Sequence, residues 1–263
     1  MDNTFWFKQT ADKPLFPDML WSKPENKRHA GKLLIIGGNL HGFAAPATSY
    51  TQVEKAGIGT VRVLLPDAIH KLVGGFLPDA NYGSSTPSGS FSQKSLVEWL
   101  EQSAWADGIL LAGDLGRNSE TAIVIEKFLE KHSGPVALTK DAVDYVVANP
   151  LPVLSRPETA LILSFSQLQK LATNARFTTA FTFDMDLIRL VEALRAFSLQ
   201  YPVYIVTKHL DSLIVAVNGQ VSTTKLNRDI DIWRVSIAAS TIVWWLQHPN
   251  KPFEAITTGI TTK

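Results

Sequence analysis

The stretch KLLIIGG, from Lys32 to Gly38, decides the fold class, because it is a short apolar run that ends in a glycine pair. Such runs are typical of strands that are buried on both faces of a parallel sheet. Helical spacing follows over residues 45–57, with Gly57 as the expected C-cap, and TVRVLLP (60–66) predicts the next strand. A strand, a loop, a helix and a second strand in this order predict a βαβ unit.

The same alternation continues along the chain. We expect further strands over 108–113, 135–139, 160–164 and 202–208, and helices over 119–132, 141–148, 164–172, 185–200 and 231–248. The alternating segment 212–224, with Asn218-Gly219 at its centre, predicts a β-hairpin that adds an antiparallel edge. The sequence therefore predicts one α/β domain over 1–263, a three-layer sandwich with a mostly parallel central sheet flanked by helices.

Two segments at the ends of the chain are rich in aromatic residues. Residues 1–30 resemble an arm whose aromatic side chains pack either on their own domain or on a second subunit. Trp244 and Trp245 lie on the last predicted helix and belong either to the core or to a subunit interface, so a homo-oligomer is one expectation. The low-complexity segment NYGSSTPSGSFS (81–92) predicts a mobile surface loop.

Composition excludes several classes of protein. The formal charge of +1, from 25 Lys and Arg against 24 Asp and Glu, argues against nonspecific binding of nucleic acid. The absence of cysteine excludes disulfides and thiolate chemistry. We find neither a signal-peptide pattern nor an apolar run long enough to cross a membrane, and we expect a cytoplasmic protein.

Candidate binding groups follow the predicted strands. The loops 37–47 and 112–121 can bring backbone N–H groups to an anion, although neither fits GxGxxG or a P-loop and plain tight turns fit equally well. Lys208 ends a strand, where it either contacts a phosphate or is solvated. Asp231 begins the last helix, as a base or as a partner of the helix dipole. The six histidines have no metal-ligand spacing, and we predict no dedicated metal site.

A series of motifs over roughly 28–247 matches, in order and spacing, the motifs of one known family. RHAGKLLIIGG is similar to that family's RHKG and IGG strand, and GFAAPATSYTQVEKAGIGTVRV to its YxGAP loop, helix and strand. GILLAGDLGRNSET is similar to IGPGLGRDEET, with Asp114 in place of a glycine. PVALTKDAVDYV follows PVVLDADALNLL, with Thr139 in place of the first acid and Asp141 kept. The chain therefore resembles the ADP- or ATP-dependent NAD(P)H-hydrate dehydratases of the ribokinase-like superfamily.

The resemblance implies a ribokinase-like fold and a lyase that uses ATP or ADP with Mg²⁺ to dehydrate NAD(P)H hydrate. It places the catalytic base at Asp231. It implies that the substrate contacts Ala45, Gly116, Ser164 and Asp231. It implies that the nucleotide contacts Lys208, His209, Ser212 and Ile230.

The site motifs depart from those of the family. Its GGTGD corresponds to NRDID (227–231), so side chains occupy the glycine positions of a phosphate cradle. Ser164 stands in place of a histidine, Gln167 in place of a glutamate and His209 in place of a glycine. A non-catalytic pseudoenzyme that binds a ligand or a partner is therefore the alternative, and a small-molecule kinase is a weaker one.

Overall fold

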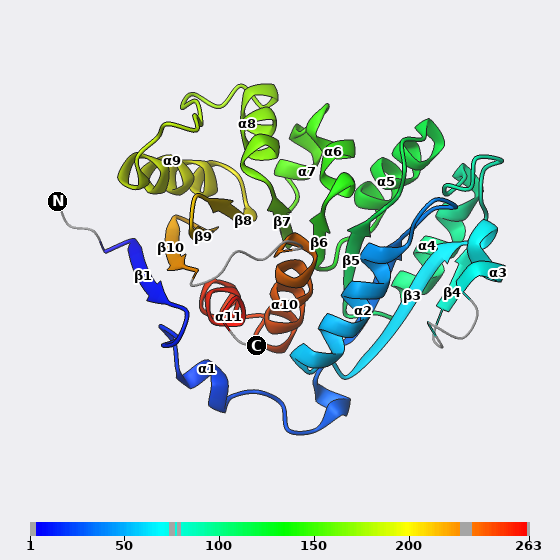
Figure 1. Cartoon of the computed structure of the whole chain (residues 1–263), viewed down its shortest axis with the longest axis horizontal. Helices are drawn as coiled ribbons and strands as arrows, with labels where there is room; N and C mark the ends of the chain where they lie inside the picture. The colour runs from blue at the N-terminus through cyan, green and yellow to red at the C-terminus, as the bar shows by residue number, and fades with distance from the viewer. Residues whose placement is uncertain (1–3, 74–76, 78–79, 227–232, 262–263) are drawn as a thin grey trace.

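The computed structural model describes residues 4–73, 77, 80–226 and 233–261, and these form a ten-stranded sheet flanked by helices (Figure 1). The strand order is β1-β10-β9-β8-β7-β6-β5-β2-β3-β4. Within the described residues, β9 alone runs antiparallel to its neighbours. The predicted α/β sandwich with a mostly parallel sheet is confirmed.

The strands are β1 (Trp6–Thr10), β2 (Lys32–Gly37), β3 (Thr60–Pro66), β4 (Ala80–Gly83), β5 (Gly108–Gly113), β6 (Val136–Thr139), β7 (Thr159–Leu163), β8 (Val203–His209), β9 (Ser212–Val217) and β10 (Gln220–Lys225). The helices are α1 (Asp18–Trp21), α2 (Ala44–Ala56), α3 (His70–Val73), α4 (Leu96–Ser103), α5 (Ser119–Lys131), α6 (Asp141–Val147), α7 (Leu151–Leu154), α8 (Phe165–Asn174), α9 (Leu187–Gln200), α10 (Trp233–Gln247) and α11 (Pro252–Gly259).

The sheet has one hydrophobic core on each face. In β2, Leu34 and Ile36 face a core that contains side chains of α4, α5, α6, α8 and α9. Leu33 and Ile35 point the other way, into a core with side chains of α2, α10 and α11. Successive side chains of a strand alternate between faces, so the apolar run of β2 is buried on both sides. This gives the three layers visible in Figure 1.

The N-terminal arm contributes an edge strand, which the sequence did not predict. β1 pairs in parallel with β10, from Trp6 opposite Val221 to Thr10 opposite Lys225. The hairpin around Asn218-Gly219 is confirmed, with positive φ angles of 48° and 80° at its turn. It is not the edge of the sheet, because β1 covers its outer strand.

The prediction of a mobile surface loop over 81–92 is wrong. The segment begins inside β4 and then folds on itself, with the Gly89 N–H donating to the Thr86 carbonyl at 2.8 Å. Phe91 is fully buried and packs edge-on against Trp99, with ring centroids 5.1 Å apart. A large buried ring stabilises the segment more than its polar composition suggests.

Most aromatic residues of both chain ends pack within the domain, whereas Trp21 of the arm is 89% exposed. Trp244 and Trp245 are 0% and 1% exposed, so they belong to the core and not to a subunit interface. Phe7 of the arm lies 5.4 Å, between ring centroids, from Phe253 of α11. Because these rings are already covered, they give no support to a homo-oligomer, and the oligomeric state stays a prediction.

Candidate functional site

The carboxyl ends of β2, β5 and β6 meet at one edge of the sheet, where parallel sheets bind ligands. The two glycine-ended strands approach each other closely there: a Cβ on Gly37 would lie 2.4 Å from the Gly113 carbonyl oxygen. Any side chain at position 37 would push these strand ends apart. The glycine at the end of β2 therefore lets the loops after β2 and β5 come together.

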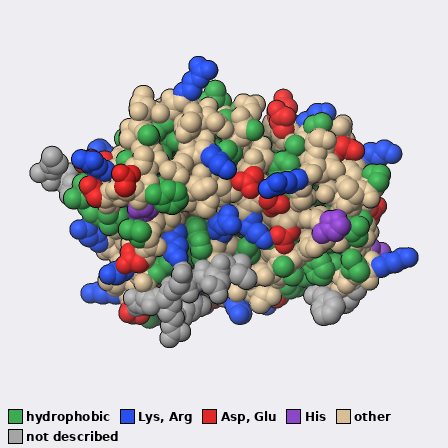
Figure 2. Space-filling view, turned by 45° about the horizontal axis from the view of Figure 1, so that its top comes forward, with side chains coloured by type: hydrophobic (Ala, Val, Ile, Leu, Met, Phe, Trp, Pro, Cys, Tyr) green, Lys and Arg blue, Asp and Glu red, His purple; other side chains and the backbone are tan. Residues whose placement is uncertain are grey.

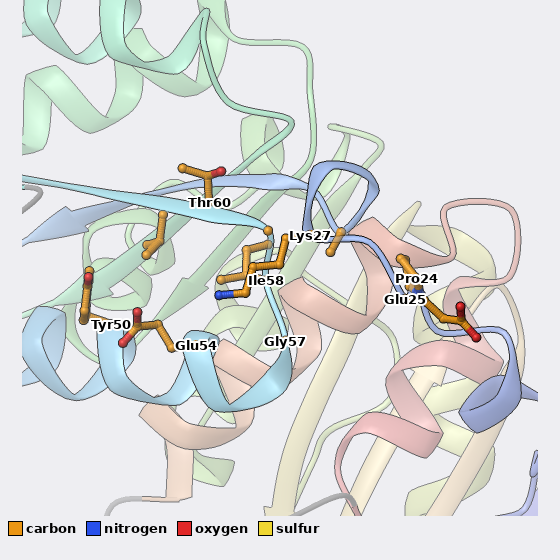
Figure 3. A pocket seen from close by; sticks show the side chains of 11 residues that line it. Pro24, Glu25, Lys27, Tyr50, Glu54, Gly57, Ile58 and Thr60 are labelled. Carbon is orange, nitrogen blue, oxygen red and sulfur yellow. The ribbon is translucent and has the colours of Figure 1, made fainter.

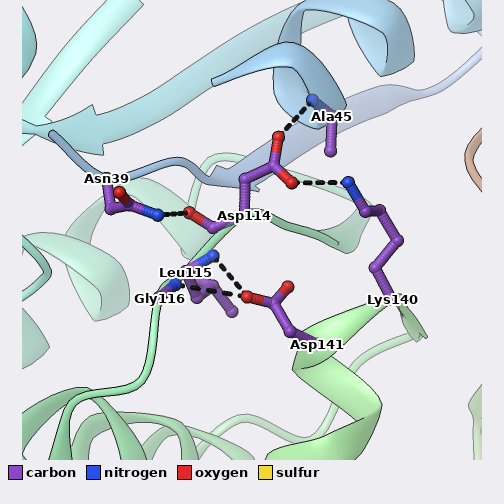
Figure 4. Close-up of polar contacts among 7 residues, drawn as sticks. All are labelled: Asn39, Ala45, Asp114, Leu115, Gly116, Lys140 and Asp141. Atoms are coloured by element: carbon purple, nitrogen blue, oxygen red, sulfur yellow. Dashed lines mark hydrogen bonds and ion pairs between the residues drawn. The ribbon is translucent and has the colours of Figure 1, made fainter. Parts of the chain in front are cut away.

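Asp114, immediately after β5, joins three loops (Figure 4). Its Oδ2 accepts a 2.7 Å hydrogen bond from the Ala45 N–H at the start of α2. Its Oδ1 lies 2.5 Å from Lys140 Nζ, and its backbone carbonyl accepts a hydrogen bond from Asn39 Nδ2 at 2.5 Å. Its φ of +57° is a left-handed conformation that glycine adopts most easily, which fits its position in place of the family's glycine.

Asp141, at the start of α6, holds the loop after β5 from the other side (Figure 4). Its Oδ2 accepts hydrogen bonds from the backbone N–H groups of Leu115 and Gly116 at 2.9 and 3.2 Å. Tyr145, one turn further along α6, donates its hydroxyl proton to the Gly116 carbonyl and accepts from the Asn118 N–H at 3.1 Å. The backbone around Gly116 is thus fixed by side chains of α6.

The pKa of Asp141 depends on its burial and on the charges and hydrogen bonds around it. Burial raises the pKa of Asp141, and the negative charge of Asp114 raises it further. The two backbone N–H donors and the Lys140 ammonium act in the opposite direction, because they favour the charged carboxylate. Asp141 is therefore a carboxyl group whose proton is held more tightly than in water.

Ser164 and Gln167 link this cluster to α8. Ser164 is the N-cap of α8 and forms a capping box with Gln167, accepting from the Gln167 N–H at 3.2 Å. The buried amide of Gln167 donates to the Lys140 carbonyl and to Asp144 Oδ1, both at 2.8 Å. Its oxygen accepts from Arg234 of α10 at 3.1 Å. Ser164 is thus within the same hydrogen-bond network as Ala45 and Gly116, and its hydroxyl has a structural role there.

The predicted nucleotide contacts Lys208, His209 and Ser212 lie at the neighbouring end of β8 and the start of β9. His209 is 5% exposed, and its ring centroid lies 4.6 Å from that of Phe165, the residue after Ser164. The Nε2 of His209 has no protein hydrogen-bond partner. Ser212 donates its hydroxyl proton to the neighbouring Asp211 at 3.1 Å.

The described part of the chain therefore brings six predicted contacts to one edge of the sheet: Ala45, Gly116, Ser164, Lys208, His209 and Ser212. The predicted base Asp231 and the predicted contact Ile230 lie outside the described residues. Sequence reasoning did not identify Asn39, Lys140 and Tyr145 as partners in the site. In the sequence, these three residues are marked only by their position after a strand or inside the following helix. Many residues without a role in a site occupy such positions.

Two hollows lie apart from this cluster. One, of about 340 Å³, is lined by the end of α2, the start of β3 and residues 24–30, at the opposite ends of the strands (Figure 3). The other, of about 650 Å³, lies among α5, α6 and α7, and Tyr145 contributes to its wall. Neither contains any of the predicted contacts.

Acidic and basic side chains are interspersed over the face shown in Figure 2, as expected from the small net charge. Among the residues that the structure describes, no three His, Asp or Glu side chains are grouped to hold a metal ion. No helix of the described segments is both long and apolar enough to span a lipid bilayer.

Curated proteins give partial sequence matches, whereas no family model matches the chain. The chain is 28% identical over 156 residues to the bifunctional NAD(P)H-hydrate repair enzyme Nnr of Methanothermobacter thermautotrophicus, and 27% identical over 128 residues to that of Dictyoglomus turgidum. The matches span 57% and 48% of this chain but 30% and 25% of the two enzymes. The chain thus matches less than a third of the length of these relatives.

Solved structures show the same fold over nearly the whole chain. A ribokinase-like superfamily protein from Enterococcus faecalis superposes with a TM-score of 0.72 at 16% identity, covering 98% of this chain and 86% of its own. The ADP/ATP-dependent NAD(P)H-hydrate dehydratase of Bacillus subtilis, co-crystallised with ATP/Mg²⁺ and soaked with CoA, superposes with a TM-score of 0.63 at 13% identity, covering 94% and 86%. The fold is ribokinase-like, and the resemblance to the dehydratases is confirmed at the level of fold and partial sequence similarity.

Proposed function

We propose that this chain is a divergent NAD(P)H-hydrate dehydratase, which uses ATP or ADP with Mg²⁺ to restore NADH or NADPH from the hydrate. The observation that carries the proposal is the placement of Ala45, Gly116 and Lys208 along the same edge of the sheet, after β2, after β5 and at the end of β8. The partial similarity to the repair enzymes and the fold shared with the Bacillus dehydratase support it.

The reaction requires a base, a residue that contacts the transferred phosphate, and residues that bind the hydrate in position. A carboxylate takes the proton of the hydrate's hydroxyl group, and that oxygen then attacks the terminal phosphorus and displaces the nucleoside di- or monophosphate. Phosphate leaves with the C–O bonding pair as a ring proton is lost, which restores the double bond. We assign the base to Asp231 and the phosphate contact to Lys208, with Ala45, Gly116 and Ser164 on the dinucleotide side.

The nucleotide and its metal supply the phosphoryl group and neutralise its charge. The residues at the end of β8 fit a phosphate in part. Lys208 contributes a cation at a strand end, and the buried His209 Nε2 has no protein partner. Asp211 brings a negative charge to the same turn, which is partly offset by Lys225 at 3.4 Å.

The test is recovery of NADH absorbance from its hydrate, with ATP or ADP and Mg²⁺. The unmodified chain should recover NADH, whereas Asp231→Asn and Lys208→Met should each lose at least about 90% of the rate, as expected for a lost base or phosphate contact. Lys127→Met, an exposed lysine of α5, is the matched control and should keep the full rate. No recovery with either nucleotide contradicts the proposal.

A non-catalytic role is the second candidate, favoured by the groups that already fill the dinucleotide side. The Asp114 carboxylate accepts the hydrogen bond of the Ala45 N–H, and the Ser164 hydroxyl caps the N-terminus of α8. A ligand-binding protein without phosphoryl transfer predicts no change in melting temperature with millimolar ATP or ADP and Mg²⁺. An enzyme predicts a rise, because a ligand that binds the native state stabilises it.

A further inference from the structure

The N-terminus of α2 is capped by a side chain from a distant part of the chain. The preceding residue, Phe43, offers no side-chain acceptor, and Pro46 has no N–H. The free Ala45 N–H is taken by the Asp114 carboxylate, 69 residues further along the sequence. A helix N-terminus attracts anions, because its unpaired N–H groups and the helix dipole both favour negative charge. In this chain a carboxylate already occupies that position.

Asp114 and its counterion adopt costly backbone conformations. Both Asp114 and Lys140 have positive φ angles, +57° and +53°, which glycine adopts more easily than a residue with a Cβ. Their side chains are 17% and 31% exposed and meet at 2.5 Å. Glycine at position 114 would relieve the strain but would remove the carboxylate. The ion pair and the cap offset the strain.

The space beside Gly116 is also filled from within the chain. A Cβ on Gly116 would lie 2.9 Å from Ser90 Oγ and 3.4 Å from Asn39 Nδ2. Ser90 belongs to the packed segment after β4, and Asn39 is tied to the Asp114 carbonyl. The dinucleotide side of the proposed site is therefore lined by a fixed carboxylate, its lysine and two small polar side chains.

We infer that Asp114 is a specificity-determining residue, whose carboxylate excludes phosphate groups from the N-terminus of α2, so that only an uncharged part of the ligand can lie beside Ala45. The inference rests on the proposed function, since it specifies which part of a dinucleotide lies beside Ala45. A phosphate at Ala45 would face a like charge and would have to break the pair between Asp114 and Lys140. With the carboxylate removed, Lys140 and the Ala45 N–H become a cation and a donor for the phosphate.

Binding of inorganic pyrophosphate, measured by calorimetry, tests the inference on the full chain. Asp114→Gly, which suits the left-handed backbone, should bind pyrophosphate at least about tenfold more tightly than the unmodified chain. Asp114→Asn, which keeps the shape and removes the charge, should show part of this gain. Asp114→Gly combined with Lys140→Met should lose it. Phosphate bound at Lys208 contributes equally in every protein and cancels in the comparison.

The matched control is Asp186→Gly, which removes the capping carboxylate of α9 and should leave pyrophosphate affinity unchanged. Thermal melts of every variant establish that it is folded. Equal pyrophosphate affinity in the unmodified chain and in folded Asp114→Gly overturns the inference and assigns Asp114 to helix capping alone.

The dehydration assay separates this inference from the proposed function. A gain of pyrophosphate affinity in Asp114→Gly, with no NADH recovery in the unmodified chain, supports the inference about the site and rejects the dehydratase. NADH recovery in the unmodified chain, with no gain of affinity in Asp114→Gly, supports the dehydratase and rejects the inference.

Discussion

The carboxylate of Asp141 accepts a 3.2 Å hydrogen bond from the backbone N–H of Gly116 and thereby fixes the loop that follows β5. The same oxygen accepts from Leu115, whereas the other, Oδ1, is buried without a protein partner. One carboxyl group thus positions the loop and carries a charge close to that of Asp114.

Asp141→Asn should change the pH dependence of stability. Its amide oxygen can keep both backbone hydrogen bonds, and its charge is gone. The pKa of Asp141 is raised in the folded protein, so ionisation of this group lowers the free energy of unfolding. This loss of stability is complete once the pH exceeds the folded pKa. It is absent below the ordinary pKa of 3.8, where the group is protonated in both states. The unfolding free energy of Asp141→Asn relative to the unmodified chain should therefore rise between pH 4 and pH 8.

Urea denaturation across this pH range measures the difference. Asp18→Asn, which removes an exposed carboxyl group of α1, is the control. A flat difference for Asp141→Asn as well would show that its carboxyl group is not destabilised by folding.

His132 should contribute to acid sensitivity. Its ring stacks on Phe128 at 5.1 Å, and burial, together with the nearby charge of Arg156, lowers its pKa from 6.5 to about 4. A histidine with a lowered folded pKa stabilises the protein above pH 6.5, and this contribution is lost as the pH falls toward 4. His132→Phe keeps the stacking and cannot be protonated. On acidification, the free energy of unfolding should therefore fall by about 1–2 kcal/mol less in His132→Phe than in the unmodified chain. This value is smaller than the full pKa shift implies, because solvent still reaches the ring.

Urea unfolding of both proteins at pH 7, 5.5 and 4 checks this. The control is His41→Phe, on the loop after β2. An equal loss of stability on acidification in His132→Phe and the unmodified chain would contradict the prediction.

Gln167→Glu should destabilise the protein even though it restores the family's glutamate. The Gln167 amide donates to the Lys140 carbonyl and to Asp144, and an ionised carboxylate can donate to neither. Its carboxylate would also lie beside the Asp144 charge, and the hydrogen bond from Arg234 to position 167 would offset this repulsion only in part. We expect a loss of about 2–3 kcal/mol at pH 7, smaller near pH 4, where a protonated carboxyl can donate one of the bonds.

Thermal denaturation at the two pH values measures this loss. Gln102→Glu is the control, because Gln102 accepts from Arg62 and a carboxylate keeps that role. Unchanged stability of Gln167→Glu at pH 7 would contradict the hydrogen-bond assignment.

Gln9→Ala should loosen the edge strand. Gln9 is 4% exposed, donates to the Thr257 carbonyl at 2.7 Å, and accepts from the Leu15 N–H at 2.7 Å. Its loss leaves both backbone groups without this partner and should cost about 2 kcal/mol of unfolding free energy. Lys8→Ala, one position earlier and exposed, removes a cation–π contact with Trp6 and should cost under about 1 kcal/mol. An equal loss of unfolding free energy in the two variants would show that the hydrogen bonds of Gln9 do not stabilise the edge strand.

The strands and turns that could be predicted from the sequence are those whose local pattern of residues fits one structure only. KLLIIG has no polar position, and the strand it predicts is buried on both faces. Asn218-Gly219 specifies its own turn, because both residues tolerate positive φ. In contrast, WFKQT (6–10) has no clear alternation, and its pairing with β10 depends on residues more than two hundred positions away.

Part of the candidate site could be predicted where residues follow strands or match a family motif. Ala45 and Gly116 lie in loops after predicted strands, and their assignment as substrate contacts comes from the resemblance to the dehydratases and stays a prediction. The pairing of Asp114 with Ala45 and Lys140 joins positions on three separate loops, and nothing in the local sequence selects one carboxylate–lysine pair over another. Asp114 in a glycine position indicated an altered loop but did not reveal the helix end that its carboxylate caps.

The register of β1 has a consequence for protein synthesis. Trp6 pairs with Val221, so β1 cannot take its place in the sheet until the hairpin of β9 and β10 has been synthesised. The long sequence separation makes this a late and slow contact to form. Until then β1 lacks its partner strand, although it is translated before β2 to β10.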